Sequence, residues 1–521
     1  MKKILRYIFQ SLASTCLLLL LLEGAFWGLG FPQGASDFIE RTIVQQHLSL
    51  RKPVGQYRIF VYGESTIHGC GYAPTSSPVK WLEAYLKDFL PGRDIKVVNF
   101  GRMGEGSDFI VQAFLDTLQY KPDLAIFYLG HNIFSPDSRV DFVKKSEAEA
   151  GHRIKRWFCK SRLISAVIRE TIKLKIKRHS RKTQDRMGDS KIETVASFLG
   201  EANEKEIIPG SPAYLENLQY FKKNIETILK AGDRKHVPVL FMKPVCNLKD
   251  YPPSHSVHLK TLSGGELKQW DELYRRGEEA AKKGDDLQAL DLFEKASTID
   301  PTFADLSFRL GGLYFQKGEI EKARSFFEQA RDNDALIRRA TKDILRVFDD
   351  LAQQKQIHFF DTEKALLPEA PGGILGWPLI EDNVHFSIEG QSLAGRGLAD
   401  EIAKNNWIAP RSEWRFDHER TKEEISKELG ISNKTIFLNY GSVISYLGRR
   451  FDLRLEFAQR AQVLFPDHPV ALRQLAWGYW LTGDKDKALD IYKQLGKKDP
   501  LALEAVFLAQ PEIKQAYEAN Q

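Results

Sequence analysis

Five short runs of apolar residues alternate with amphipathic stretches along the chain and predict a parallel β-sheet between layers of helices. The runs occupy residues 58–62, 96–100, 123–129, 237–242 and 357–361. Helical periodicity separates these runs or follows the last one, over residues 80–89, 109–119, 216–229, 342–353 and 390–403. Strands that alternate with helices at this spacing pair in parallel and are buried on both faces. We therefore expect an α/β sandwich whose ligands bind beyond the carboxyl ends of the strands.

Two blocks of sequence between the fourth and fifth runs repeat with a period of 34 residues. Gly277, Gly284, Ala289, Phe293 and Ala296 recur as Gly311, Gly318, Ala323, Phe327 and Ala330. This period is that of tetratricopeptide repeats, in which small residues let paired helices approach closely. A weaker pair near the carboxyl terminus has its best matches at Gly483, Ala488 and Tyr492. We expect all-α repeats over residues 265–336 and 420–521, and an α/β domain split into 57–260 and 337–408.

The amino terminus has the pattern of a membrane-targeting segment. Lys2, Lys3 and Arg6 precede an apolar stretch over residues 7–31, which is interrupted by Glu23. About 20 apolar residues suffice to span a bilayer, and basic residues ahead of them keep the amino terminus in the cytoplasm. The pattern predicts a single-pass signal anchor over 1–31, a polar linker over 32–56 and an extracytoplasmic catalytic part. A cleaved signal peptide and a buried helix of a cytoplasmic protein are the alternatives.

Net charge and cysteine spacing limit the kinds of binding partner and metal site that the chain is expected to have. The formal net charge of +6 over 521 residues gives weak support for an acidic partner and none for a dedicated nucleic-acid binder. A basic, helix-compatible insertion is expected over 140–205; it is either a solvated surface or a patch for anionic lipid or an acidic polymer. The four cysteines, Cys16, Cys70, Cys159 and Cys246, lack the spacing of a metal site.

A serine directly after the first predicted strand is a candidate nucleophile. Ser65 stands in the turn Gly63-Glu64-Ser65, where its hydroxyl would be exposed at the edge of the sheet. A nucleophilic serine needs a base, and the base needs an orienting group. Asp382 and His385 are three residues apart, so the carboxylate can reach Nδ1 of the imidazole and leave Nε2 for the serine proton. The alternatives are a helix-capping serine and an incidental loop histidine.

Two further strand ends carry groups that could bind an oxyanion. Gly104 follows the second strand and offers a flexible backbone N–H, and Asn132 follows the third strand with a carboxamide donor. Together with the N–H of Ser65, these donors could hold the charge that develops on a carbonyl oxygen during acyl transfer. Each segment taken alone is also consistent with ordinary turn chemistry.

The four elements, in this order, resemble the SGNH (GDSL-type) hydrolases. The nucleophile motif of that family matches Gly63-Glu64-Ser65, its oxyanion glycine Gly104, its oxyanion asparagine Asn132, and its DxxH pair Asp382 and His385. Glu64 replaces the usual aspartate at a position that tolerates change, and Ile133 follows Asn132 where many members have aspartate. The resemblance implies a flavodoxin-like three-layer α/β sandwich and esterase, lipase or acyltransferase chemistry without a metal or other cofactor.

The resemblance leads us to expect a serine esterase for O-acyl esters, including O-acetyl esters, of an envelope or exported carbohydrate. An O-acyltransferase would use the same residues. A catalytically weak scaffold that binds a protein partner through its repeats is the alternative from another class, because repeat arrays present a concave binding surface.

Overall fold

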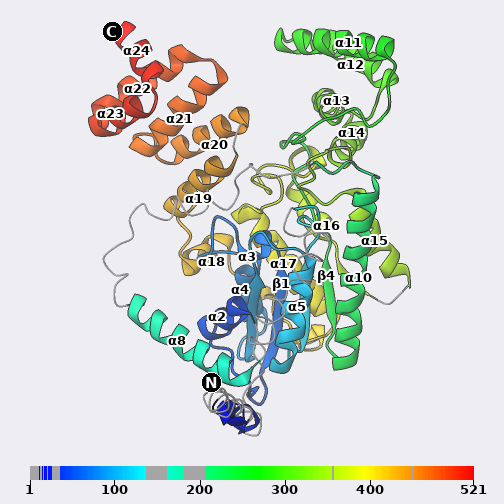
Figure 1. Ribbon diagram of the computed structural model, residues 1–521, viewed down its shortest axis with the longest axis vertical. Coiled ribbons are helices and arrows are strands. Elements are labelled where there is room, and N and C mark those ends of the chain that lie inside the picture. Colours follow the sequence, from blue (N-terminus) through cyan, green and yellow to red (C-terminus); the bar gives the residue numbers. More distant parts are fainter. Residues whose placement is uncertain are drawn as a thin grey trace, which may run out of the picture. The chain divides into compact units, whose positions relative to one another are not determined.

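The computed structural model describes residues 36–135, 161–180, 206–354, 357–447 and 450–520, together with parts of 11–25. The chain forms two compact units (Figure 1). The first unit comprises residues 1–70, 77–185 and 205–420, and the second comprises 71–76, 186–204 and 421–521. The first unit contains both the sheet and the first repeats, so these parts have defined positions relative to one another.

The sheet has five parallel strands in the order β2-β1-β3-β4-β5. Their bounds are β1 Tyr57–Gly63, β2 Ile95–Gly101, β3 Leu124–Tyr128, β4 Val239–Met242 and β5 His358–Phe360. This is the strand order of flavodoxin-like sheets. Gly63 at the end of β1 pairs in register with Gly101 of β2 and Tyr128 of β3. The carboxyl ends of these three strands are therefore level, and the residues that follow them share one edge.

Helices cover both faces of the sheet and complete the predicted three-layer α/β fold, which is confirmed. One face carries α5 Ser107–Thr117, α10 Pro212–Lys235 and α15 Lys342–Gln354, whose apolar residues pack with Phe60 and Tyr62 of β1. Figure 1 shows α10 beside α15, which it contacts. The other face carries α4 Pro78–Phe89 and α17 Ile388–Lys404, which pack together. Their close approach needs Gly395, because a Cβ there would lie 2.6 Å from Cβ of Trp81.

The segment predicted to be a polar linker over 32–56 contains a packed helix, so that prediction is wrong for its central part. Helix α2 Asp37–Gln45 buries Ile39 and Ile43 in the same core as β1 and α5. The side chain of Gln46 then exchanges two hydrogen bonds with the backbone of Asn99, at 2.9 and 3.0 Å. The nine residues of α2 are too few for helical periodicity to be judged, since about 11–18 residues are needed. The helix protects the edge strand β2.

The predicted anchor over 1–31 falls largely outside the described residues. Among the helices that the structure describes, none combines the length and apolar composition needed to cross a bilayer. Helix α8 Arg162–Ser180 forms the described part of the basic insertion, and the rest of 140–205 is not described. Arg169 of α8 pairs with the buried Glu40 of α2, so at least this basic residue is used inside the fold rather than on an open surface.

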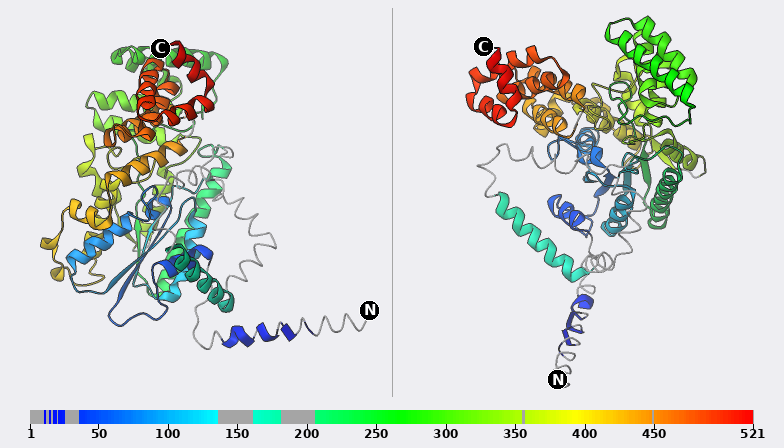
Figure 2. Two further views of the ribbon diagram at one scale, coloured as in Figure 1. Left: turned by 90° about the vertical axis from the view of Figure 1, so that its left-hand side faces the viewer. Right: turned by 45° about the horizontal axis from the view of Figure 1, so that its top comes forward.

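The first repeats form two packed pairs of helices between β4 and β5, drawn in green in Figure 2. Their bounds are α11 Gly264–Lys282, α12 Asp286–Ile299, α13 Ala304–Gln316 and α14 Ile320–Asp332. The repeated residues meet inside each pair. A Cβ on Gly277 would lie 2.5 Å from the ring of Phe293, and a Cβ on Gly311 would lie 2.7 Å from the ring of Phe327. The 34-residue pattern in the sequence therefore records the contact between paired helices.

The second unit is helical throughout its described carboxyl-terminal part. It comprises α18 Lys422–Leu429, α19 Asn433–Tyr446, α20 Phe451–Leu464, α21 Pro469–Thr482, α22 Lys485–Lys498, α23 Pro500–Ala509 and α24 Pro511–Ala519. Helices α20, α21 and α22 pack in succession, and Ala488 and Tyr492 are fully buried between them and their neighbours. Two of the residues singled out by the weaker repeat pattern are thus core residues of this unit, and the third, Gly483, ends α21 in a left-handed conformation with φ of 93°.

Candidate active site

Ser65 lies at the carboxyl end of β1, where the chain turns sharply into the short helix α3 Ser65–His68. The turn depends on Gly63, since a Cβ there would lie 2.7 Å from the backbone oxygen of Tyr128 and 2.5 Å from the side chain of Ile67. Ser65 is the half-buried residue in this turn, whereas Glu64 and Thr66 are buried. Ser65 is not the helix cap: Glu64 occupies that position, without a capping side-chain bond.

Asp382, His385 and Ser65 form a continuous hydrogen-bonded chain. Oδ2 of Asp382 lies 2.6 Å from Nδ1 of His385, and Nε2 of His385 lies 2.7 Å from Oγ of Ser65. The other carboxylate oxygen of Asp382 accepts the backbone N–H groups of Val384 and His385, at 3.0 and 2.8 Å. Asp382 thereby fixes both the loop and the tautomer of the imidazole, with Nδ1 protonated and Nε2 free to accept the serine proton.

The electrostatic surroundings of His385 favour the positively charged imidazolium form, in which both ring nitrogens carry a proton. Burial alone would lower the pKa of His385, but the charge and hydrogen bond of Asp382 outweigh it and hold the pKa well above 6.5. Cys70 adds to this effect. Cys70 is a buried free thiol five residues after Ser65, and no signal in the sequence marked it as a neighbour of the site.

The segments predicted to bind an oxyanion follow β2 and β3. Gly104 adopts a left-handed conformation with φ of 73°, and a Cβ there would meet no atom within 4 Å, so its backbone borders open space. Nδ2 of Asn132 donates to the backbone oxygen of Glu105 at 3.0 Å. A carboxamide has two N–H hydrogens, and this bond uses one of them. The bond fixes the rotamer of Asn132 and ties the two segments together.

Glu64 organises the loop Gly130–Asn132, which we call the oxyanion loop. Its carboxylate accepts the backbone N–H groups of Gly130 and His131 at 3.0 Å and that of Asn132 at 3.3 Å. Burial raises the pKa of Glu64 to about 7, against the lowering effect of these N–H groups and of His385. Nothing in the sequence indicated this role, in which Glu64 binds the segment that follows β3.

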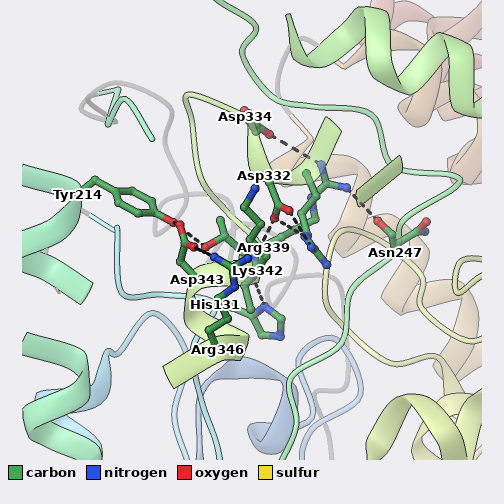
Figure 3. Close-up of polar contacts among 12 residues, drawn as sticks. His131, Tyr214, Asn247, Asp332, Asp334, Arg339, Lys342, Asp343 and Arg346 are labelled. Atoms are coloured by element: carbon green, nitrogen blue, oxygen red, sulfur yellow. Dashed lines mark hydrogen bonds and ion pairs between the residues drawn. The ribbon is translucent and has the colours of Figure 1, made fainter. Parts of the chain in front are cut away.

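His131 fastens the same loop from another side. Its Nδ1 accepts the backbone N–H of Ala340 at 3.1 Å, and its Nε2 lies 3.2 Å from the hydroxyl of Tyr128. Burial, with a smaller contribution from His385, lowers the pKa of His131 to about 3, so the ring stays neutral. Ala340 lies between α14 and α15. The oxyanion loop is therefore hydrogen-bonded to the segment that follows the first repeats, as Figure 3 shows for His131.

Arg339 holds that segment in place (Figure 3). Its side chain is 3% exposed, and Nη1 donates to the backbone oxygens of Asn247 and Tyr251 at 2.9 and 2.8 Å. Asp334 lies 3.9 Å from its Nη2 and accepts the backbone N–H groups of Ser254 and His255. The buried side chains of Asp334 and Arg339 thus join the segment that follows the first repeats to the segment that precedes them. Sequence patterns did not indicate this network.

The described residues contain no cluster of three or more His, Cys, Asp or Glu side chains that could hold a metal ion. The arrangement is suited to acyl transfer through a serine, with donors nearby for a developing oxyanion.

Comparisons with known proteins find the repeats in the sequence and distant likenesses in structure. Tetratricopeptide-repeat family models match residues 280–340 and 470–502. No curated protein matches the chain. Similar solved structures include a catalytic mutant of an acetylxylan esterase from Geobacillus stearothermophilus, with 13% identity, a TM-score of 0.32, and coverage of 67% of this chain and 96% of that chain. A GDSL-like lipase from Bacteroides thetaiotaomicron has 10% identity and a TM-score of 0.31, covering 70% and 98%.

Proposed function

We propose that this chain is a serine esterase that cleaves O-acyl esters at Ser65. The observation that carries the proposal is the hydrogen-bonded chain from Asp382 through His385 to Ser65. The three groups come from two segments on either side of the first repeats, yet their bond lengths are those of a nucleophile, a base and an orienting carboxylate. Ser65 also lacks the capping role that would offer a purely structural reason for its position.

Acylation begins when Oγ of Ser65 attacks the carbonyl carbon of the ester while Nε2 of His385 takes the hydroxyl proton. The carboxylate of Asp382 stabilises the imidazolium that results. The negative oxygen of the tetrahedral intermediate is held by the backbone N–H groups of Ser65 and Gly104 and by the free N–H of Asn132. Collapse of the intermediate breaks the ester bond, and His385 gives its proton to the departing alcohol. An acyl-serine remains.

Water then completes the reaction. His385 removes a proton from the water molecule, the hydroxide attacks the acyl-serine, and Ser65 leaves with the proton restored. A sugar hydroxyl in place of water would make the same site an acyltransferase. We propose O-acyl, including O-acetyl, groups on an envelope or exported carbohydrate as the substrate class, on the strength of the motif resemblance. Release of free acetate in the presence of an added sugar acceptor distinguishes hydrolysis from transfer.

The test uses the full chain in detergent, with acetylated polysaccharide as substrate and acetate release as the readout. Ser65→Ala is expected to abolish turnover while the protein stays folded. The matched control is Ser211→Ala, which removes a helix-capping serine of α10, costs about 1 kcal/mol of stability and leaves turnover intact. Equal turnover by Ser65→Ala and the wild type would reject the proposal. The full chain is used because a shorter fragment that begins at residue 56 would lack the packed helix α2.

We propose in addition that the amino-terminal segment holds the protein in a membrane with the enzyme outside the cytoplasm. Basic residues precede the apolar stretch, and Leu17, Leu18 and Leu21 are exposed. Membrane fractionation with protease protection tests this proposal. Recovery of most of the protein in the soluble fraction, with a new amino terminus after Gly30, would reject it.

The repeats support a proposal that the chain also binds a protein partner. Tetratricopeptide arrays commonly present a concave surface to peptides, and family models of this repeat match two parts of the chain. If the repeats alone carried the biological function, a chain with Ser65→Ala would retain that function in cells. The esterase proposal predicts that it is lost.

A further inference from the structure

Glu64 has an unusual position, because it is adjacent in sequence to the nucleophile and adjacent in space to the oxyanion loop. Its side chain is 1% exposed, and both of its oxygens are used. Oε1 accepts from Gly130 and Asn132, and Oε2 accepts from His131. Three consecutive backbone N–H groups thus converge on one carboxylate. None of the steps of the proposed reaction requires this group.

The conformation of the oxyanion loop explains why it needs such an acceptor. Gly130 has φ of 131°, a conformation that L-residues with a side chain rarely adopt. The loop is irregular here, so its N–H groups have no ladder or helix partner to satisfy them and would be costly to bury alone. A carboxylate is a stronger acceptor than a carbonyl, and it can serve several donors at once. Glu64 therefore determines where the backbone of this loop lies.

The position of the loop matters because it carries Asn132. The side chain of Asn132 is fixed at one end by the bond from Nδ2 to the oxygen of Glu105, and at the other end by its own backbone. The backbone end is the one that Glu64 holds. A displacement of that end would move the free N–H of the carboxamide away from the oxyanion, and such stabilisation depends on pre-set donor positions.

We propose that Glu64 is a positioning residue, whose carboxylate fixes the backbone of Gly130–Asn132 and so holds the Asn132 side chain at the oxyanion. The inference rests on the proposed esterase function and extends it to a residue outside the triad. It also accounts for glutamate at this position: the longer side chain reaches three N–H groups of the neighbouring strand end. Aspartate, one methylene shorter, would serve fewer of them.

Two other roles for Glu64 lead to different measurements. If its charge acted on His385, the loss of kcat in Glu64→Gln would persist after Asn132 is replaced by alanine, and the two losses would add. If it only stabilised the fold, its removal would lower the melting temperature and leave the kcat of the folded enzyme unchanged. A positioning role predicts a loss of kcat at constant KM that vanishes once Asn132 is gone, because the two residues act through one interaction.

The experiment is a double-mutant cycle on the full chain with a soluble acetyl ester. Glu64→Gln is expected to lower kcat by about tenfold to a hundredfold, the range for a lost hydrogen bond to a charged group, with KM nearly unchanged. Asn132→Ala lowers kcat by about a hundredfold or more. The double variant is expected to match Asn132→Ala alone. Glu64→Asp should recover part of the loss.

Asp334→Asn is the matched control, because Asp334 is also a buried carboxylate that accepts backbone N–H groups, on a different loop. It should lower stability without lowering the kcat of the folded protein. Additive losses in the cycle, or full kcat in Glu64→Gln, would overturn the proposal.

Hydrogen exchange of the amides of Gly130–Asn132 provides a readout that is independent of turnover. These amides should exchange faster in Glu64→Gln than in the wild type. Unchanged exchange would overturn the proposal that Glu64 fixes the backbone of this loop. If the exchange result holds while the wild type shows no turnover that depends on Ser65, the esterase function fails and the contact between Glu64 and the loop stands.

Discussion

Nε2 of His385 lies 2.7 Å from Oγ of Ser65, although the two residues are 320 positions apart in the chain. The first repeats lie within the intervening sequence and leave this contact intact. The loop of His385 is anchored beside the nucleophile by a bond from the hydroxyl of Thr66 to the backbone oxygen of Val384, at 3.3 Å. The hydroxyl of Ser65 and the imidazole therefore meet through a fixed local scaffold at the edge of the sheet.

Asp382→Asn is expected to change both the rate and its pH dependence. His385 must be neutral to accept the serine proton, so kcat/KM of the wild type should fall as the pH drops through a pKa well above 6.5. Removal of the carboxylate lowers this pKa and moves the acidic limb to lower pH. The loss of orientation should also lower kcat by about 10⁴-fold.

The control for this variant is Asp361→Asn, which alters a helix-capping carboxylate after β5 that is not part of the triad. Its pH profile should match the wild type. An unchanged acidic limb in Asp382→Asn would contradict the assigned electrostatics. The same raised pKa contributes folding stability below pH 6.5 that is lost as the pH rises through the pKa of the folded state.

The variant Asn132→Ala tests whether Asn132 donates a hydrogen bond to the oxyanion or only forms a turn. The turn after β3 is closed by the backbone of Asn132, whose oxygen accepts the N–H of Ser135 at 3.0 Å, so alanine preserves it. We expect kcat to fall by about a hundredfold to a thousandfold with little change in KM or in the melting temperature. A fully active, folded variant would mean that the N–H groups of Ser65 and Gly104 suffice.

Arg339→Met tests whether the contacts after the first repeats stabilise the fold. The substitution leaves two backbone oxygens without their donor and Asp334 without its nearby cation. The free energy of unfolding should fall by about 3–5 kcal/mol in chemical denaturation. Arg346→Met is the control, because its one ion pair with Asp343 is solvent-exposed and should contribute less than about 1 kcal/mol. Equal stability of the two variants would contradict this account.

The sequence predicted the parts of the fold that depend on local pattern. Each of the five predicted strands lies within two residues of its observed bounds, because a buried parallel strand is a continuous apolar run. Gly277 and Gly311 were found because each repeat reuses the same contact with a phenylalanine. The helix α2, with apolar residues at positions 38, 39, 43 and 44, was missed because its nine residues are fewer than the roughly 11–18 over which helical periodicity is judged.

The sequence predicted those residues of the site that stand in short motifs. Ser65, Asp382 and His385 stand in short patterns whose order along the chain is informative, and the structure brings them together. The groups that support them act through single contacts between distant segments, such as the bond from Ala340 to His131. No periodicity or spacing encodes a contact of that kind. Even Glu64, within the nucleophile motif, shows its role only when the loop after β3 is placed beside it.

Labelling with a fluorophosphonate probe, followed by peptide mass spectrometry, tests the identity of the nucleophile most directly. The probe reacts with a serine only when a base activates its hydroxyl, and the adduct mass identifies the modified residue. We predict one adduct, on Ser65, which is absent from Ser65→Ala and strongly reduced in His385→Ala. A folded wild-type protein that takes up no probe at Ser65, or that is labelled equally in Ser65→Ala, would contradict the assignment of Ser65 as the nucleophile.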